Sequence, residues 1–465
     1  MKRVFSLLLA FALLLSYCSI VYTESSEPEK KNSGDFEYIL IEDGTARITK
    51  YRGKASELVI PEKLDGITVT SIGDCAFISY LFSPLTSVTI PNNVTDIGDY
   101  AFSNCRNLID VILPDSVTRI GNWAFSGCDS LSKIIIPDSV TSIGANPFED
   151  CKNLKIMRIS PDHPTLAVID GVLFYKPDKL LVCCPMGLAK EVYSIPQGVK
   201  SIGIDAFYNN MNLISLTIPD SVTSIHANPF RYCGNLSSII ISPDHPTLTV
   251  IDGALISKLD SRLVWYPMKS SEKIYSVPEG TLTIENSAFE SCKNLTDVNI
   301  PDSVTSIGDN AFVGCTNLIS ISLPNSITSI GNHVFSSCSN LTSITIPNDV
   351  TSIGDMSFCY CFRLASVKIP DSVTSIGISA FQYCESLISV TIPNNVTDIG
   401  HSAFSNCTNL ASVVIPDSVM KIGFGAFTGC NYLTLTVPRN SYAAQYCNEN
   451  GLNYTYPDSL DWLTN

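Results

Sequence analysis

The segment IPDSVTSIGDNAFVGCTNLISIS, from Ile300 to Ser322, is followed at once by a variant of itself, LPNSITSIGNHVFSSCSNLTSIT, which starts at Leu323. Further variants begin at Ile346, Ile369 and Ile392, so the phrase returns every 23 residues. A fixed period of this size is the signature of a solenoid, in which each repeat forms one coil and buries its apolar residues against the next coil. The sequence therefore predicts one elongated stack of coils.

Each phrase carries the residues of one coil. Leu318, Ile321 and Leu323 follow an L-x-x-I-x-L pattern, and residues two apart point to the same side of a β-strand. Pro324 lacks an amide hydrogen and ends that strand, and a helical turn or tight bend then carries residues 332–338. Coils stacked about 4.8 Å apart place each apolar residue above a copy of itself. We expect a β-rich solenoid of parallel strands repeated every 23 residues, with short helical turns between them.

The composition excludes several classes of protein. Of the 465 residues 16% are charged, against about 25% in typical soluble domains, because every coil repeats the same apolar set. The chain holds 29 basic and 44 acidic residues, a net charge of −15. Nucleic acids and anionic membranes need basic patches, so neither is an expected partner. Beyond the N-terminus no apolar run approaches the ~20 residues that span a bilayer.

The N-terminus predicts a secretory signal peptide over residues 1–23. A short basic start precedes an apolar run, residues 4–15, that is too short for a spanning helix. Cleavage is expected near Cys18 or near Thr23. The sequence Leu15-Ser16-Tyr17-Cys18 loosely resembles a bacterial lipobox, which leaves open a lipid anchor at Cys18. The protein is expected to be secreted or displayed on the cell surface.

Polar residues 24–35 predict a flexible linker after the signal peptide. Residues 36–60 alternate without the repeat, and Asp43-Gly44 marks a hairpin turn between two strands. This pattern predicts an N-terminal β cap that shields the first coil. The solenoid is then expected to occupy residues 61–438.

The last residues, 439–465, depart from the repeat and predict a C-terminal cap. Ser441 can cap a short helix whose end is marked by Gly451, and a final strand can follow at residues 453–456. Tyr442 and Tyr446 would share one face of this helix and cover the last coil.

Two long inserts interrupt the period, near residues 160–200 and 242–282. The segment ISPDHPTLAVIDGVLFYKPDKLLVCCPMG from Ile159 matches ISPDHPTLTVIDGALISKLDSRLVWYPMK from Ile241. In both copies an Asp-Gly pair, which is the strongest short-range hairpin signal, lies between two strand-like runs. The inserts are expected to add β coils or protruding hairpins to the solenoid.

The IPxSVTxIGxxAFxxC core closely resembles the repeat of the BspA-like (Treponema-type) leucine-rich repeat family, over nearly all of the chain. This resemblance implies a non-enzymatic surface protein that adheres to host proteins, matrix proteins or other cells. Two alternatives remain open. One is a carbohydrate-binding or hydrolytic surface protein, and the other is a structural spacer without a specific ligand.

Cysteines are the strongest chemical feature of the chain, which contains 17 of them. Parallel stacked neighbours would point the same way, so disulfides between them would be strained, and free cysteine is a good small core residue. We therefore expect a buried column of free thiols. Cys183-Cys184 and Cys359-Tyr-Cys361 are weak metal signals. No histidine or carboxylate group shows a catalytic arrangement, so no catalytic, metal or cofactor site is expected. The column contains Cys75, Cys105, Cys128, Cys151, Cys233, Cys292, Cys315, Cys338, Cys361, Cys384, Cys407 and Cys430.

Candidate partner-binding residues lie in two places. Exposed apolar patches mark interaction sites, and Tyr and Trp are typical interface anchors. Both sets also have a plain explanation, as residues with high β-propensity and as fillers of a hairpin. The first set is an apolar stripe of outward strand positions in the N-terminal half, and it includes Ile112, Ile135, Arg158 and Ile240. The second set is aromatic and lies in the inserts, as Phe174, Tyr175, Trp265 and Tyr266.

Overall fold

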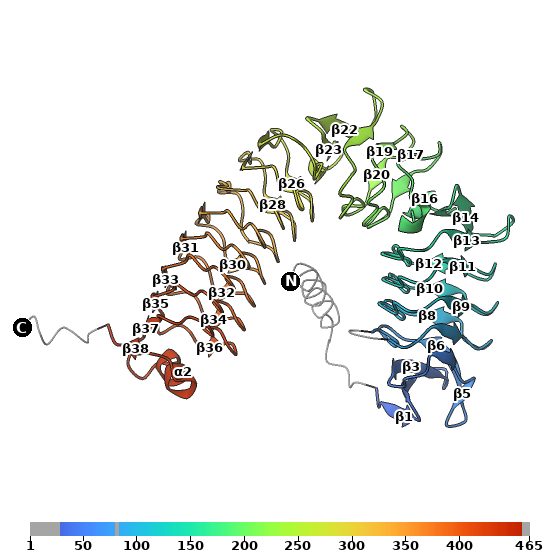
Figure 1. The fold of residues 1–465 in the computed structure, drawn as a ribbon, viewed down its shortest axis with the longest axis horizontal. Helices are drawn as coiled ribbons and strands as arrows, with labels where there is room; N and C mark the ends of the chain where they lie inside the picture. The colour runs from blue at the N-terminus through green and yellow to red at the C-terminus, as the bar shows by residue number, and fades with distance from the viewer. Residues whose placement is uncertain (1–27, 80–82, 458–465) are drawn as a thin grey trace, which may run out of the picture. The chain divides into compact units, whose positions relative to one another are not determined.

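A computed structural model describes residues 28–79 and 83–457 and shows a β-solenoid of stacked coils (Figure 1). The predicted signal peptide and the lipid-anchor candidate Cys18 lie outside the described residues. The chain divides into two compact units, which are treated one at a time. The N-terminal unit extends to Leu188 and includes Gly203–Tyr208, and the C-terminal unit contains Ala189–Ile202 and the residues from Asn209 onward.

In the N-terminal unit, the regular coils each contribute one strand of three residues and one strand of two. These strands pair in parallel with their copies one coil away, as Ser87 does with Asp110 and Arg119 with Ser142. The long strands are β4 (Glu57–Val59), β7 (Ser87–Thr89), β9 (Asp110–Ile112), β11 (Lys133–Ile135) and β13 (Ile156–Arg158). The short strands are β8 (Asp96–Ile97), β10 (Arg119–Ile120) and β12 (Ser142–Ile143).

The N-terminal cap contains an antiparallel hairpin with the predicted Asp43-Gly44 turn, where Gly44 has a φ of 79°. The expected linker is too long, because its residues Lys31–Ser33 form an edge strand that pairs with the hairpin through a turn at Gly34. The first coil also begins before the expected residue 61, since β4 already pairs with β7. The cap strands are β1 (Lys31–Ser33), β2 (Phe36–Leu40), β3 (Ala46–Tyr51), β5 (Lys63–Leu64) and β6 (Ile67–Ile72).

The C-terminal unit also contains a row of long strands and a row of short strands. The long strands are β17 (Val192–Ser194), β19 (Ser215–Thr217), β21 (Ser238–Ile240), β25 (Ile274–Ser276), β27 (Asp297–Asn299), β29 (Ser343–Thr345), β31 (Ser366–Lys368), β33 (Ser389–Thr391), β35 (Ser412–Val414) and β37 (Thr434–Thr436). The short strands are β18 (Ser201–Ile202), β20 (Ser224–Ile225), β26 (Thr283–Ile284), β28 (Ser306–Ile307), β30 (Ser352–Ile353), β32 (Ser375–Ile376), β34 (Asp398–Ile399) and β36 (Lys421–Ile422).

The C-terminal cap consists of helix α2 (Tyr442–Asn450) and strand β38 (Tyr454–Thr455), which pairs with β37. Both predicted helix signals are confirmed. The hydroxyl of Ser441 accepts a hydrogen bond from the amide of Ala444, and Gly451 ends the helix in the left-handed conformation. Tyr446 is buried against the last coil, whereas Tyr442 is exposed, so only one of the two predicted tyrosines covers the stack.

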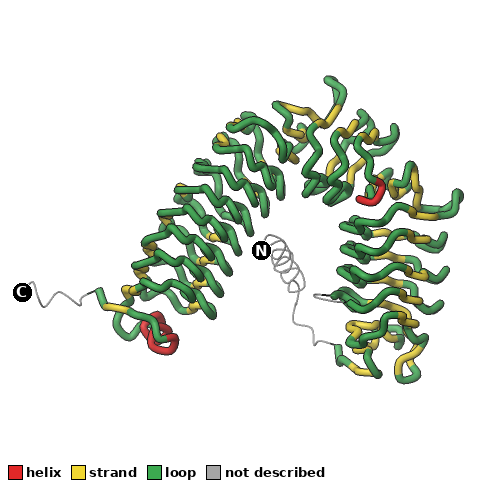
Figure 2. Tube along the Cα trace, in the orientation of Figure 1, coloured by secondary structure: helices red, strands yellow, loops and turns green. Residues whose placement is uncertain are grey.

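The segments between strands are hydrogen-bonded turns and not helices. Within the described residues, helical structure is confined to α2 and a single turn, η1 (Met186–Leu188) (Figure 2). The turns between a short strand and the next long strand contain residues with positive φ, such as Asn104 at 59° or Tyr383 at 60°, which a helix does not tolerate. The predicted short helical turns are therefore wrong, and the tight bend is the form adopted. No helix in the part of the chain that the structure describes is long and apolar enough to cross a membrane.

The core of each unit is a set of columns in which like residues stack. The rings of Phe102 and Phe125 lie 5.3 Å apart and within 2° of parallel. Next to this column, buried cysteines donate their thiol hydrogens to the carbonyl of the phenylalanine 26 residues earlier, as Cys315 does to Phe289 at 3.0 Å. The same bond is made by Cys128, Cys151, Cys338, Cys361, Cys384 and Cys407. The same carbonyl also accepts an amide hydrogen within its own coil, as Phe289 does from Cys292, so the thiol adds a second hydrogen bond that links neighbouring coils.

Candidate functional site

Both inserts form a three-stranded antiparallel meander, and the third strand of the second insert pairs in parallel with a short strand, β26. The predicted turns are confirmed, because Asp170 and Gly171 have φ angles of 52° and 83°, and Asp252 and Gly253 have angles of 47° and 85°. Such a pair of left-handed residues makes the two-residue turn that matches the twist of a hairpin. The strands are β14 (Leu166–Ile169), β15 (Val172–Tyr175) and β16 (Leu180–Cys183), and β22 (Leu248–Ile251), β23 (Ala254–Ser257) and β24 (Arg262–Trp265).

One fully buried histidine holds the start of each insert. The Nδ1 atom of His163 accepts hydrogen bonds from the amides of Thr165 and Leu166, and its Nε2 atom lies 3.1 Å from the carbonyl oxygen of Pro137. His245 makes the equivalent contacts in the second insert. This pattern assigns a neutral ring with the hydrogen on Nε2, so both histidines are structural groups of the turn.

The aromatic residues of the inserts are part of the core. Trp265 and Tyr266 are each only 1% exposed, and Phe174 is also buried. Trp265 packs edge-on against Phe230 at 5.8 Å. Tyr175 is partly buried and donates its hydroxyl hydrogen to the carbonyl of Thr141. We therefore no longer propose Phe174, Trp265 and Tyr266 as anchors, because residues on both faces of β15, β23 and β24 are buried.

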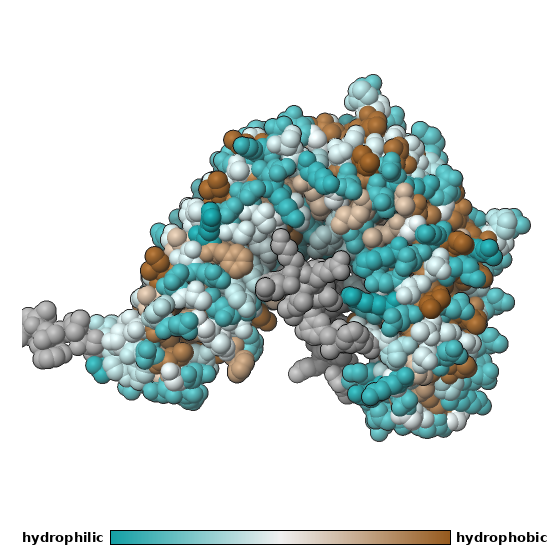
Figure 3. All heavy atoms as spheres, in the orientation of Figure 1, coloured by the Kyte–Doolittle hydropathy of each residue, from teal (hydrophilic) through white to brown (hydrophobic). Residues whose placement is uncertain are grey.

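The aliphatic residues of the first set are exposed as predicted. On β9 and β11, Ile112 and Ile135 are each 51% exposed. Val59 on β4 is 73% exposed in the same outward column, where Thr89 lies between it and Ile112. Ile156 on β13 is exposed in the neighbouring column, in register with Lys133. We refer to Val59, Ile112, Ile135 and Ile156 as the aliphatic stripe of the N-terminal unit. Figure 3 shows apolar side chains (brown) gathered over these strands, with hydrophilic side chains (teal) around them.

The other two candidates take different positions. Arg158 is exposed and pairs in register with Ile135, so it lies at one end of the stripe. Ile240 is 50% exposed but belongs to β21 of the C-terminal unit. The sequence analysis missed Val59, although it lies one residue before the inward-facing Ile60 and therefore points outward.

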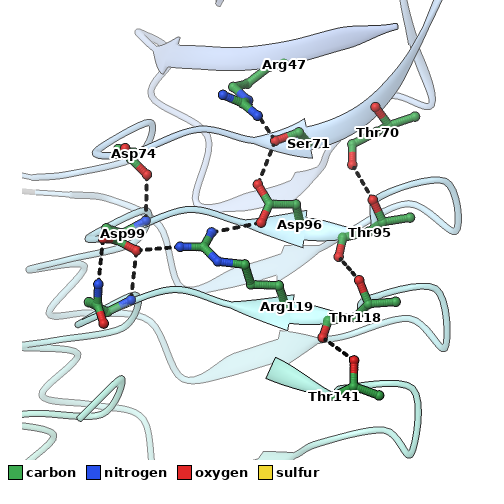
Figure 4. A network of polar contacts seen from close by, with 11 residues as sticks. Arg47, Thr70, Ser71, Asp74, Thr95, Asp96, Asp99, Thr118, Arg119 and Thr141 are labelled. Atoms are coloured by element: carbon green, nitrogen blue, oxygen red, sulfur yellow. Dashed lines mark hydrogen bonds and ion pairs between the residues drawn. The ribbon is translucent and has the colours of Figure 1, made fainter. Parts of the chain in front are cut away.

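The short-strand row of the N-terminal unit carries polar side chains that bond to one another (Figure 4). Arg119 joins Asp96 at 2.8 Å and Asp99 at 2.9 Å, and threonines at the coil position of Thr118 bond to the carbonyl of the preceding copy. The side chain of Arg119 is 41% exposed, so solvent screens these ion pairs and each adds little stability. The hydrogen-bonding groups of this face serve the stack itself.

The long-strand face of the C-terminal unit is different again. Its outward positions are mostly serine and threonine, and between β27 and β29 the pairing is reduced to single bridges. A shallow polar hollow lies there. It is lined by Asp297, Asn299, Ser320, Ser322, Ser343 and Thr345, among others.

Chemical groups in the described residues do not converge on a reactive centre. No cluster of three or more His, Cys, Asp or Glu side chains in residues 28–79 and 83–457 has the geometry of a metal site. Apart from Cys75, Cys184 and Cys233, the described cysteines are free thiols. Burial raises the pKa of the Cys315 thiol to about 12 and raises the pKa of Cys384 well above its ordinary value. Thiols held protonated in this way are poor nucleophiles.

Comparison with known proteins identifies the repeat. A family model described as BspA type Leucine rich repeat region matches in six copies, over residues 54–180, 189–259, 266–388 and 374–453. None of the curated proteins compared with the chain matches it.

Solved structures also match the chain. A leucine-rich cell surface protein from Faecalibacterium prausnitzii is 27% identical, with 92% of this chain and 98% of that chain covered and a TM-score of 0.38. A leucine-rich repeat protein from Bacteroides ovatus is 28% identical, with 94% and 99% covered and a TM-score of 0.43. The pneumococcal vaccine antigen PcpA is 17% identical, with 93% and 99% covered and a TM-score of 0.38.

Proposed function

This chain belongs to the BspA-type leucine-rich repeat family, and we propose that it is a secreted or cell-surface protein that binds other proteins and serves adhesion. Leucine-rich repeat proteins are generally without enzymatic activity. One relative of similar length is described as a cell surface protein, which supports the proposed location. The signal-peptide pattern of residues 1–23 supports export.

The aliphatic stripe is the observation that carries the proposal. Isoleucine is costly to hold half exposed, since burying such a side chain is worth about 1.5–3 kcal/mol. The stripe groups Ile112, Ile135 and Ile156 on neighbouring coils, whereas the same positions of most later coils carry serine or threonine. Because the repeat readily accepts a polar residue there, the solenoid itself does not require isoleucine. A partner protein that covers the stripe would explain why these exposed positions hold isoleucine.

The carbohydrate-binding alternative finds less support. Sugars commonly pack on the free face of an aromatic ring. Two of the partly exposed aromatic pairs among the described residues are stacked face to face, Tyr100 on Trp123 at 5.2 Å and Tyr360 on Tyr383 at 4.9 Å. Each ring of a pair thus covers a face of its neighbour, and Trp265 and Tyr266 of the inserts are buried.

A binding screen of residues 24–465 tests the proposal. Extracellular-matrix proteins, serum proteins and polysaccharides would be immobilised, and the wild-type chain compared with an Ile112→Ser/Ile135→Ser variant. Loss of two half-exposed isoleucines from an interface should weaken binding on the order of tenfold. The matched control is Ile319→Ser/Ile388→Ser, which removes two isoleucines of similar exposure from the C-terminal unit.

The outcomes separate the three functions. Saturable protein binding that the stripe variant weakens and the control variant retains supports adhesion through the stripe. Binding to polysaccharides alone would favour the carbohydrate-binding alternative. A chain that binds none of the tested molecules would favour the structural spacer.

A further inference from the structure

We propose that the aliphatic stripe binds the same stripe of a second copy of this chain, with the two stacks of coils running in opposite directions. This inference rests on the proposed function, because it takes the stripe as the binding surface, and it names one partner. Two features of the N-terminal unit carry it: the register of its long strands, and the charges that this register places beside the isoleucines.

The register of the long strands arranges their outward side chains in two columns. Figure 1 shows β9, β11 and β13 along one side of the N-terminal unit. In the order of the coils, the first column contains Glu57, Ser87, Asp110, Lys133 and Ile156. The second column contains Val59, Thr89, Ile112, Ile135 and Arg158. On β9 and β11, therefore, an acidic and a basic residue lie in one column and two exposed isoleucines lie in the other.

This face is complementary to itself about a two-fold axis that is parallel to the strands and midway between β9 and β11. Such an axis reverses the order of the coils and keeps each column opposite itself, so every contact occurs twice. Asp110 of each copy lies opposite Lys133 of the other. Ile112 of each copy lies opposite Ile135 of the other, and both are half exposed in the single chain. The arrangement thus forms two ion pairs and two apolar contacts at its centre.

Other two-fold arrangements of the same face fit less well. An axis through β9 sets Asp110 against itself, and an axis through β11 sets Lys133 against itself. An axis along the stack places the charged column on the isoleucines, where charges would be buried without partners. An axis between β7 and β9 pairs Lys133 with the acidic Glu57, but it places Thr89 opposite Ile112 at the centre.

The coils on either side of the centre bring no like charges together within the strands. Arg158 lies opposite Thr89 and Lys155 lies opposite Thr86, so the remaining cations of this face meet hydroxyl groups that can accept hydrogen bonds. Ile156 lies opposite a serine at the rim of the contact. The register between β9 and β11 is therefore compatible with the whole face from β7 to β13.

The dimer should be weak. The strands from β7 to β13 offer a patch of about 20 Å by 10 Å, which is small beside the about 800 Å² per partner of a standard interface. In the turns after the strands, Asp115 and Asp138 of opposite copies approach each other and repel. We expect a dissociation constant of about 100 µM. Opposed stacks suit chains displayed on two facing cells, where many weak contacts add up by avidity.

Charge exchange between the two copies tests the inference. Sedimentation equilibrium of residues 24–465, at about 10 µM to 1 mM, gives the dissociation constant. Asp110→Lys sets lysine against Lys133, and Lys133→Asp sets aspartate against Asp110. Each variant alone should therefore self-associate about tenfold more weakly than the wild-type chain. The control Lys368→Asp, which reverses an exposed charge on β31 of the C-terminal unit, should change nothing.

An equal mixture of the Asp110→Lys and Lys133→Asp variants should associate about as tightly as the wild-type chain. In the mixed dimer both charge pairs again have opposite signs, so attraction replaces repulsion at both places. The doubly exchanged chain, Asp110→Lys/Lys133→Asp, should also associate like the wild type. Recovery in either form shows that the single variants are folded and that the two positions meet across the dimer.

Apolar and repulsive contacts give two further measurements. Ile135→Ser should weaken self-association about tenfold, because it removes two isoleucines from the symmetric contact, and the exposed-isoleucine control Ile388→Ser should not. Asp115→Asn removes the repulsion at the edge of the contact and should strengthen self-association about threefold.

Three results would overturn the inference: a wild-type chain that stays monomeric up to about 1 mM, charge reversal that leaves self-association unchanged, or a mixture that associates no better than each variant alone. If one of these occurs while the protein screen still finds a ligand that depends on the stripe, adhesion stands and self-recognition does not. If the screen fails as well, both fall.

Discussion

At the end of its third strand the first insert carries Cys183 and Cys184, whereas the second insert carries Trp265 and Tyr266 at the same two positions. All four side chains are buried. The amide of Cys184 donates to the carbonyl of Ala206, and the amide of Tyr266 donates in the same way to Ala288. The backbone is therefore the same where the volume of the side chains differs greatly.

The residues that the two inserts share fall at places where the backbone has special demands. Each insert has a buried histidine in its first turn and an Asp-Gly pair between its first two strands. Lys176 and Lys258 bond to the carbonyls of these histidines. Turns and hydrogen bonds therefore define the insert, and its side-chain packing is adjusted locally to the neighbouring coil.

The largest difference between the inserts should appear when their packing residues are truncated. Trp265→Ala should lower the free energy of unfolding by about 3–5 kcal/mol, because it leaves a large cavity beside Phe230. Cys183→Ala removes one sulfur atom and should cost about 1 kcal/mol. Urea unfolding, with hydrogen exchange of residues 254–265 and 172–183, measures both.

The exposed Ile274→Ala on β25 serves as the control and should change stability by less than about 0.5 kcal/mol. Equal losses for Trp265→Ala and Cys183→Ala would contradict the role of Trp265 as a core residue. Trp265→Phe, which keeps an aromatic ring in the core, should leave partner binding unchanged.

The second difference between the inserts should appear in the dependence of stability on alkaline pH. Burial is the main cause that raises the pKa of Cys183 well above its ordinary value, with the nearby Cys184 and Cys151 adding to it. Since the folded pKa lies above the unfolded pKa of about 8.5, the stabilisation is complete below pH 8.5 and is lost as the pH rises. For one thiol the loss is about 1.4 kcal/mol per pH unit.

Urea midpoints at pH 8 and pH 10 test this expectation. The free energy of unfolding of the wild-type chain should fall between pH 8 and pH 10. For the Cys183→Ala/Cys184→Ala variant this fall should be smaller by about 2 kcal/mol. The remaining buried thiols contribute equally to both chains. An identical pH dependence in the two chains would show that Cys183 is not held protonated by burial.

A smaller difference in stability should appear when one asparagine beside each insert is replaced. Asn146 and Asn228 lie in the coils before the inserts and donate across them to residues 59 positions later, Asp205 and Ser287. Asn228 also accepts a hydrogen bond from the amide of Phe230 at 2.9 Å. Because an unsatisfied buried group costs about 1–3 kcal/mol, Asn228→Ala should destabilise the fold by about 1 kcal/mol more than Asn146→Ala.

Thermal unfolding of the two alanine variants measures this difference. Asn228→Asp keeps the acceptor oxygen and removes the donor, so it should separate the two bonds of Asn228. If Asn146→Ala proves the more destabilising of the pair, the bond to Phe230 contributes nothing to the second insert.

Much of this architecture could be predicted from the sequence, because the determining signals are local. The period of 23 residues, the Asp-Gly turns, and Ser441 and Gly451 at the ends of α2 each act within a few positions of the chain. The burial of the insert aromatics could not be predicted in this way. Strand β24 is covered on both faces, so alternation does not reveal which side of it faces solvent.

The contacts of Asn146 and Asn228 were also beyond the sequence, because their partners lie 59 residues away, across an insert of irregular length. The candidate surface was predicted in part. Ile112 and Ile135 follow from strand alternation, but Val59 lies in a coil that the repeat pattern did not include. The position of Val59 in the first coil is set by the pairing of β4 with β7. No local sequence signal in residues 57–59 predicts this pairing.

The smallest effect is expected at the second strand of the inserts, where Tyr175 of the first insert corresponds to Ser257 of the second. The hydroxyl of Tyr175 donates to the carbonyl of Thr141 at 3.2 Å near the surface, so water can replace this bond. Tyr175→Phe should therefore cost no more than about 0.5 kcal/mol in thermal unfolding. Tyr175→Ser, which copies the second insert, should cost about 1–2 kcal/mol more, because it also exposes the aliphatic surface that the ring covers. If the serine and phenylalanine variants are equally stable, the ring of Tyr175 contributes nothing to the packing of the first insert.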